Sequence, residues 1–441
     1  MQIKDHVEKL IDPAKNASIS LVPNSGIQFL DYGLALSMAP QEAFRFLDEQ
    51  LPPEETRQGI VKRTRVHALE RNPAPADTDP DDRTYRSLVE GGPQRVVAES
   101  SYQVQPMDAL ERFDRQWMPV PFFKATSAPG KHDAGPTNWA RVYLALPPKA
   151  ERRTTPARLV IAFDTEILPK LVGKVYAGPE EADASDPGVT FSLVKTMDRQ
   201  LSFAAGAWQR EWIRDSYIAG LIATGNEQRA ARLPQESGEP WAQYVAYLQS
   251  LLAMLQFPTI DLIDVFGLAA DAMQPGGRSR RLTHLDVDLI LDVGNSRTCG
   301  ILIEQGAGQD SIGIGQPPAR LELRDFSRPE LVSSRPFESH VEFQPASFGR
   351  SEHGRGSGRP GTKDAFRWPS SLRTGAEAAW LASKTDGRDG ISGMSSPKRY
   401  VWEKSRRTQN WVNNRAGRAT GEPLPSIISA TTSKLAPDGR I

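Results

Sequence analysis

The chain has 441 residues, enough for about three domains of ordinary size or for two with long insertions. Lysine and arginine total 54, and aspartate and glutamate also total 54, so the net charge argues against electrostatic binding of nucleic acid or of an acidic membrane. The single cysteine, Cys299, excludes an intramolecular disulfide and favours a reducing compartment, so we predict a cytoplasmic protein. No apolar run reaches the roughly 20 residues of a membrane-spanning helix, which argues against insertion by that route.

The N-terminal part reads as a series of short strands. Residues 19–22 and 27–30 flank a Pro-Asn-Ser-Gly cluster at 23–26 and predict a β-hairpin that ends at Asp31. Short apolar runs with proline, glycine or asparagine nearby predict further strands at residues 117–123, 139–146 and 159–163.

Helical periodicity begins near residue 204. Apolar and aromatic residues recur at helical spacing from Trp208 to Ile222, which predicts one amphipathic helix. Residues 241–256 are apolar around most of the helix circumference, so a second helix is predicted to be mostly buried and to end before Pro258. The tryptophans at this spacing indicate core packing rather than a ligand platform. Together these elements predict a mixed α+β accessory module over residues 1–275.

The best linker lies at residues 274–281, which contain two glycines, a proline and three arginines without a large apolar side chain. The second domain is therefore predicted over residues 282–441. Within it, residues 351–363 are glycine-rich and basic, and the region near 305–364 is predicted to be a flexible insertion.

The most informative stretch is a predicted hairpin that begins the second domain. An apolar strand at 287–291 is predicted to be buried and ends in Asp292. A second apolar strand follows at 299–303, and its first residue, Cys299, is expected to be a small buried residue at the exit of the turn. Gly294 between them permits close approach of an anion to the backbone, while the hydroxyls of Ser296 and Thr298 supply donors. Asp292 is then placed to hold Mg²⁺, which needs only one or two carboxylates beside phosphate and water. The alternative is an ordinary hairpin turn.

This turn carries a family resemblance. Residues 292–298 resemble the first phosphate loop of the actin, sugar-kinase and heat-shock-chaperone ATPases, whose fold is ribonuclease H-like. Residues 366–373, followed by Gly375 and residues 377–379, are similar to the Pro-Ser strand and the helix start that follow in the chaperone and bacterial-actin branches. Residues 396–400 resemble the segment with the catalytic lysine of the chaperone branch, with proline in place of alanine.

The resemblance implies an α/β nucleotide-binding domain with ATP and Mg²⁺ as cofactors. Asp292 would hold the metal and Lys398 would offset charge on the transferred phosphoryl group. The implied phosphate-binding residues are Gly294, Asn295, Ser296, Arg297 and Thr298. The alternative for Lys398 is a solvated loop.

The whole arrangement, including residues 21–31, resembles the bacterial virulence factor SrfB family, which implies a cytoplasmic bacterial protein with an ATPase-like region. No second phosphate loop or glycine-rich adenosine motif follows Lys398, and the sequence before Ile441 reads as a turn. We therefore expect the first lobe of the nucleotide-binding domain alone, as part of a longer protein.

Two other functions are compatible with these motifs. One is a scaffold or assembly protein that keeps an actin-like fold without hydrolysis and binds protein partners or itself. The other is a small-metabolite kinase, because residues 292–297 also resemble the opening loop of type III pantothenate kinases. The six scattered histidines and one cysteine do not have the spacing of a tetrahedral zinc site.

Overall fold

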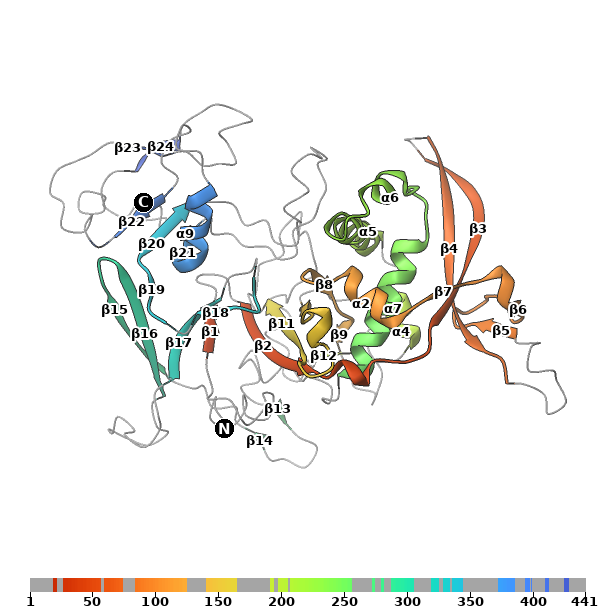
Figure 1. The fold of residues 1–441 in the computed structure, drawn as a ribbon, viewed down its shortest axis with the longest axis horizontal. Coiled ribbons are helices and arrows are strands. Elements are labelled where there is room, and N and C mark those ends of the chain that lie inside the picture. Colours follow the sequence, from red (N-terminus) through yellow and green to blue (C-terminus); the bar gives the residue numbers. More distant parts are fainter. Residues whose placement is uncertain are drawn as a thin grey trace.

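The computed structural model describes a mixed α and β protein in two main parts (Figure 1). Within the described part of the chain, no helix is long and apolar enough to cross a membrane. The described residues are 19–21, 27–56, 59–73, 84–124, 140–164, 191–193, 197–204, 207–255, 272–273, 279–280, 287–304, 319–324, 328–333, 335–343, 372–384, 393–396, 398, 409–411 and 424–427.

A four-stranded antiparallel sheet forms the centre of the N-terminal part. Its strands, in spatial order, are β2 (Ile27–Leu34), β11 (Ala157–Asp164), β10 (Ala140–Ala145) and β8 (Trp117–Pro119). Beside it, β9 (Phe122–Lys124) pairs with β12 (Phe191–Leu193). The strands predicted at 117–123, 139–146 and 159–163 are therefore confirmed.

Both faces of this sheet are covered. Alternate residues such as Leu144 and Leu159 join the main hydrophobic core, whereas Tyr143 and Val160 join a second cluster with Trp212 on the opposite face. Because strands covered on both faces place most of their side chains in apolar surroundings, they appear in the sequence as nearly continuous apolar runs, here with the buried Arg141 as an exception in β10.

Helices cover the main face of the sheet. They are α2 (Pro106–Arg112), α4 (Met197–Ala204), α5 (Ala207–Ala223), α6 (Glu227–Arg232) and α7 (Glu239–Met254). The predicted helices correspond to α5 and α7, and α7 is buried along most of its length. The indole N–H of Trp241 donates to the Ala204 carbonyl at 2.9 Å, which confirms a packing role for this tryptophan.

A second, five-stranded sheet extends from the helices. Figure 1 shows its long hairpin, β3 (Phe44–Thr56) and β4 (Gly59–Arg71), at the far end of the molecule. The remaining strands are β5 (Thr84–Ser87), β6 (Val96–Val97) and β7 (Tyr102–Val104), and the spatial order is β6-β5-β4-β3-β7. Short 3₁₀ turns connect elements of the N-terminal part: η1 (Leu36–Met38), η2 (Ala98–Ser100) and η3 (Lys149–Glu151).

The C-terminal part contains the predicted hairpin. Its sheet has the order β1 (Ile19–Leu21), β17 (Ala319–Arg324), β16 (Arg297–Glu304) and β15 (Val287–Val293). Two short strands extend this sheet, β18 (Val332–Ser333) on β17 and β19 (Phe337–Glu338) on β16. A smaller sheet places β20 (His340–Phe343) between β21 (Leu372–Thr374) and β22 (Gly393–Ser395), beside α9 (Gly375–Lys384). The remaining pairs are β13 (Ala272–Met273) with β14 (Ser279–Arg280), and β23 (Gln409–Trp411) with β24 (Leu424–Ile427).

Two sequence-based expectations differ from the structure. The hairpin predicted at residues 19–30 is wrong, because β1 pairs in parallel with β17 whereas β2 pairs with β11 in another sheet. A parallel pairing between strands about 300 residues apart leaves no local signal in the sequence. The region near 305–364, expected to be a flexible insertion, contains the four sheet strands β17 to β20.

Ion pairs connect the two parts. Arg324 in β17 is buried, and its guanidinium donates to both carboxylate oxygens of Asp31 in β2 while it lies 4.8 Å from the ring centroid of Phe29. A second pair joins Arg115 to the buried carboxylate of Glu330. The domain division at residues 275–282 stays a prediction; β1, from the N-terminal end, belongs to the C-terminal sheet.

Candidate functional site

The proposed phosphate turn is the tip of the β15–β16 hairpin. Asp292 lies opposite Cys299, and Val293 lies opposite Thr298, so both strands run further than predicted. The N–H of Gly294 donates to the Arg297 carbonyl at 2.9 Å, which leaves a two-residue loop of Asn295 and Ser296. A Cβ at position 294 would lie 2.5 Å from the Arg297 carbonyl oxygen, so this tight closure requires glycine.

The side chains of β15 are unexpectedly exposed. Leu289 and Ile290 are each 50% exposed and Leu291 is 49% exposed, so the expectation of a buried strand before Asp292 is wrong. Cys299 is also exposed, contrary to the expectation of a small buried residue. The strand lies at the end of its sheet, and within the described residues only β16 pairs with it.

Asp292 is exposed, and within the described part of the chain no hydrogen bond or ion pair engages its carboxylate. Arg297 at the other side of the turn is exposed as well. The tip therefore presents a carboxylate and a guanidinium on either side of the two-residue loop.

Ser339 stabilises the turn through hydrogen bonds. This buried residue lies between β19 and β20, and its hydroxyl donates to the Gly294 carbonyl at 2.8 Å. The Thr298 hydroxyl lies 2.8 Å from the same Ser339 oxygen and is thus placed to donate to it. The N–H of Ser339 donates to the Ser296 carbonyl at 2.9 Å. The hydroxyl of Thr298, expected to bind phosphate, is instead engaged inside the protein.

The same serine connects the turn to the segment of Lys398. The Ser339 carbonyl accepts the N–H of Ser396 at 2.7 Å, and β22, which precedes Ser396, pairs with β20. Ser396 has a φ of 54°, a left-handed conformation that turns the chain after the strand. Lys398 follows two residues later and is exposed.

The predicted helix start at Gly375 lies near the hairpin and the Lys398 segment, beside β19 and β20. Gly375 begins α9 with a φ of 65°, and a Cβ there would lie 3.5 Å from Cβ of Phe337 in β19. Residues 366–371 of the predicted Pro-Ser strand lie outside the described residues, whereas Leu372 and Arg373 form β21. The structure therefore brings the hairpin, the helix start and the Lys398 segment together around residues 337–343.

Ser339 was not predicted from the sequence. A single serine in a region that was expected to be a flexible insertion gave no signal, because its role depends on partners 41 to 57 residues away in the chain. The alternating residues at 340–343, which form the central strand of the small sheet, were a local indication of order there.

A second polar cluster lies in the five-stranded sheet. His67 is fully buried, with Nδ1 2.9 Å from the Ser87 hydroxyl and Nε2 2.9 Å from the Glu49 carboxylate. Ser87, His67 and Glu49 thus follow the order of nucleophile, base and acid in a catalytic triad. However, the Ser87 oxygen also accepts the Val89 N–H at 3.0 Å, and a Cβ on Gly92 would lie 2.4 Å from it. Because neighbouring groups already surround the oxygen, this cluster stabilises the sheet and leaves no room for a substrate.

Within the described residues, no group of three or more histidine, cysteine, aspartate or glutamate side chains is arranged to hold a metal. A metal at the hairpin would thus depend on one carboxylate together with a phosphate ligand.

Comparison with the solved structures and with the curated proteins found no match. The family model described as virulence factor SrfB matches residues 9–440, which is almost the entire chain, and the chain therefore belongs to the SrfB family.

Proposed function

We propose that this SrfB family protein is virulence-associated and binds ATP with Mg²⁺ at the tip of the β15–β16 hairpin, as the first lobe of an actin-like domain. The observation that carries the proposal is the network around Ser339, which joins the turn at Gly294 and Ser296 to the segment that leads to Lys398. The three segments that resemble nucleotide-binding motifs, namely the turn, the helix start and the Lys398 segment, are thus neighbours.

The residues present fit a magnesium ion. Asp292 is exposed, its carboxylate has no partner among the described groups, and it lies beside the turn. A hard cation with nucleotide phosphates needs one or two protein carboxylates, so Asp292 would hold Mg²⁺. The ion would supply positive charge that offsets the charge of the phosphates.

The turn would bind the phosphates. Gly294 closes the loop, and the backbone N–H groups of Asn295 and Ser296 have no acceptor among the described residues. The Ser296 hydroxyl and the exposed guanidinium of Arg297 add donors of the kind that phosphates prefer. Thr298 would act indirectly, because its hydroxyl is directed to Ser339 and holds the turn in shape.

Lys398 would be the electrostatic catalyst of phosphoryl transfer. Its backbone is held near the turn by the hydrogen bond between Ser396 and Ser339. A lysine ammonium near the terminal phosphate stabilises charge that develops in the transition state. Lys398→Ala should therefore lower turnover more than it lowers affinity.

The test is a titration of fluorescent ATP against the full chain in Mg²⁺ and in EDTA. We expect saturable, Mg²⁺-dependent binding that Asp292→Asn weakens about tenfold or more, the equivalent of about 1.4 kcal/mol. Asp108→Asn is the matched control, since Asp108 is an exposed carboxylate on α2 in the N-terminal part. Binding that Asp292→Asn leaves unchanged would sink the assignment.

A second candidate function is a scaffold that retains the fold without hydrolysis and associates with itself. The observation in its favour is the row of exposed apolar side chains on β15, at an edge whose other neighbour is absent among the described strands. Exposed apolar strands at sheet edges pair readily with other strands. Antiparallel pairing of two copies around Ile290 would place Leu289 opposite Leu291, and Asp288 opposite Asp292.

Light scattering separates this candidate from the first. Self-association through β15 should be lost in Leu291→Lys, and it should strengthen with ionic strength because salt screens the opposed aspartates. Leu291→Lys should leave ATP binding intact, whereas Asp292→Asn should not weaken association. A monomer at every protein and salt concentration would contradict the scaffold.

A further inference from the structure

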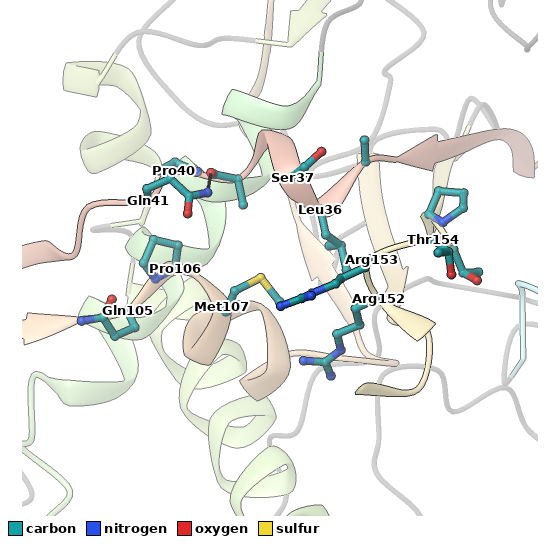
Figure 2. Close-up of a pocket in the computed structure, with 14 residues that line it drawn as sticks. Leu36, Ser37, Pro40, Gln41, Gln105, Pro106, Met107, Arg152, Arg153 and Thr154 are labelled. Atoms are coloured by element: carbon teal, nitrogen blue, oxygen red, sulfur yellow. Dashed lines mark hydrogen bonds between the residues drawn. The ribbon is translucent and has the colours of Figure 1, made fainter. Parts of the chain in front are cut away.

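A cavity of about 690 Å³ lies in the N-terminal part, away from the hairpin, and Figure 2 shows its lining. Three separate stretches of the chain line it: residues 35–41 around η1, residues 105–107 at the start of α2, and residues 152–156 after η3. Its volume falls within the range of about 300–1,000 Å³ that is usual for small-molecule sites.

The floor and walls of the cavity are largely apolar. Leu36, Ala39 and Pro106 are buried, and Met107 packs against the main hydrophobic core. A ligand that fills this space would therefore bury apolar surface, and that burial favours binding.

Arg152 forms part of the wall and is already engaged. Its guanidinium donates to the Glu111 carboxylate, and its Nε donates to the Pro147 carbonyl at 3.2 Å. Lys149 also contacts Glu111, at 3.2 Å. Burial raises the pKa of Glu111, but the contacts with Arg152 and Lys149 outweigh it and hold the pKa below its ordinary value. Glu111 is thus ionised and fully used by these two cations.

Arg153 is different from its neighbour. It is exposed, and among the described residues no acid pairs with it. In Figure 2 its side chain extends from the turn after η3 across the cavity toward Met107, while that of Arg152 points away. The cavity therefore combines an apolar floor with a guanidinium that has no acidic partner among the described residues.

We propose that this cavity binds a carboxylate that carries a short apolar group, as at the C-terminus of a peptide or in a free aliphatic acid. The guanidinium of Arg153 would receive the carboxylate, since its planar donors match the two oxygens. The apolar group would lie over Leu36 and Met107. The polar rim, formed by Ser37, Gln105 and Thr154, would remain in contact with water. This site is independent of nucleotide binding at the hairpin.

The ε-methyl group of Met107 gives a direct reporter. We would label the methionines of the full chain with ¹³C at the methyl position, assign Met107 by the Met107→Leu variant, and titrate three probes by NMR. The probes are acetyl-Ala-Ala-Leu with a free carboxylate, the same peptide as its amide, and octanoate. We expect the Met107 methyl resonance to shift saturably with a carboxylate probe, and the amide to bind about tenfold more weakly or not at all.

Two variants test the role of the guanidinium. Arg153→Gln should weaken binding of the carboxylate probe by about tenfold or more, and Arg153→Lys by less, because lysine keeps the charge but loses the planar fork. Arg232→Gln, a change at another exposed arginine, is the matched control and should have no effect. Binding of the peptide alone would identify a peptide C-terminus as the ligand, and binding of octanoate would extend the class to free acids. No shift with either carboxylate, or equal affinity for acid and amide, would overturn the proposal.

Discussion

Two pairs of antiparallel strands have similar apolar sequences but different environments. In β10–β11 of the N-terminal sheet, Leu144, Leu159 and Val160 are fully buried. In β15–β16, Leu289 and Ile290 are half exposed. The difference arises because helices and a second apolar cluster cover both faces of the first pair, whereas β15 is the last of the described strands in its sheet. An apolar run thus encodes a strand, and distant elements decide whether that strand is buried.

The largest expected effect comes from the same truncation in both pairs. Leu159→Ala should lower the free energy of unfolding by about 2–5 kcal/mol, because it leaves a cavity in a packed core. Leu289→Ala should change it by less than about 1 kcal/mol, since half of that side chain already contacts solvent. Urea denaturation followed by circular dichroism measures both values. Equal losses would show that β15 is covered in solution.

A second contrast concerns two carboxylates, one engaged and one without a partner among the described residues. Glu111→Gln should lower the free energy of unfolding by about 1–3 kcal/mol at neutral pH, because Arg152 and Lys149 lose an ionised partner. Asp292→Asn should change it little, since no described group pairs with that carboxylate.

Acid titration sharpens this contrast. Because folding lowers the pKa of Glu111, its contribution is present above its ordinary pKa and is lost as the pH falls through the lower pKa of the folded state. The stability of the wild-type protein should therefore fall more steeply with acid than that of Glu111→Gln. Parallel curves for the two proteins would contradict the ion-pair account.

The smallest expected effect is within the covered core. Tyr244 donates to the Pro119 carbonyl at 2.6 Å, so Tyr244→Phe should cost about 1–2 kcal/mol. The buried hydroxyl of Tyr247 has no hydrogen-bond partner among the described groups, so Tyr247→Phe should be neutral or stabilising by up to about 1 kcal/mol. Thermal unfolding of the two variants provides the comparison, and a destabilised Tyr247→Phe would reveal a partner such as a buried water.

The fold was predictable where the signal is local. The spacing of apolar residues predicts α5 and α7, and the short apolar runs predict β10 and β11, because periodicity reflects a face that must be buried. The pairing of β1 with β17 was not predictable in this way, since the turn residues after β1 are compatible with a hairpin and with a crossing to another sheet. Neither the apolar periodicity nor the turn residues contain information on a partner strand far along the chain.

The turn of the candidate site was predictable from the sequence, but the hydrogen bonds around Ser339 that hold it were not. The sequence predicts the hairpin, and the structure has it, with a shorter loop closed by Gly294 and Arg297. The exposure of Cys299 and the role of Ser339 both depend on which strands lie next to β16, and no residue pattern near 299 or 339 encodes that arrangement.

Cys299 provides the most direct test of nucleotide binding at the hairpin. It is the single cysteine of the chain, it is exposed, and it lies opposite Asp292. The rate of its alkylation by iodoacetamide therefore reports on this site alone. At ATP concentrations about ten times the dissociation constant of the wild type, we expect an alkylation rate about tenfold lower with Mg²⁺, and a rate lowered by about twofold or less in Asp292→Asn at the same ATP concentration. An alkylation rate that saturating ATP and Mg²⁺ leave unchanged would contradict it.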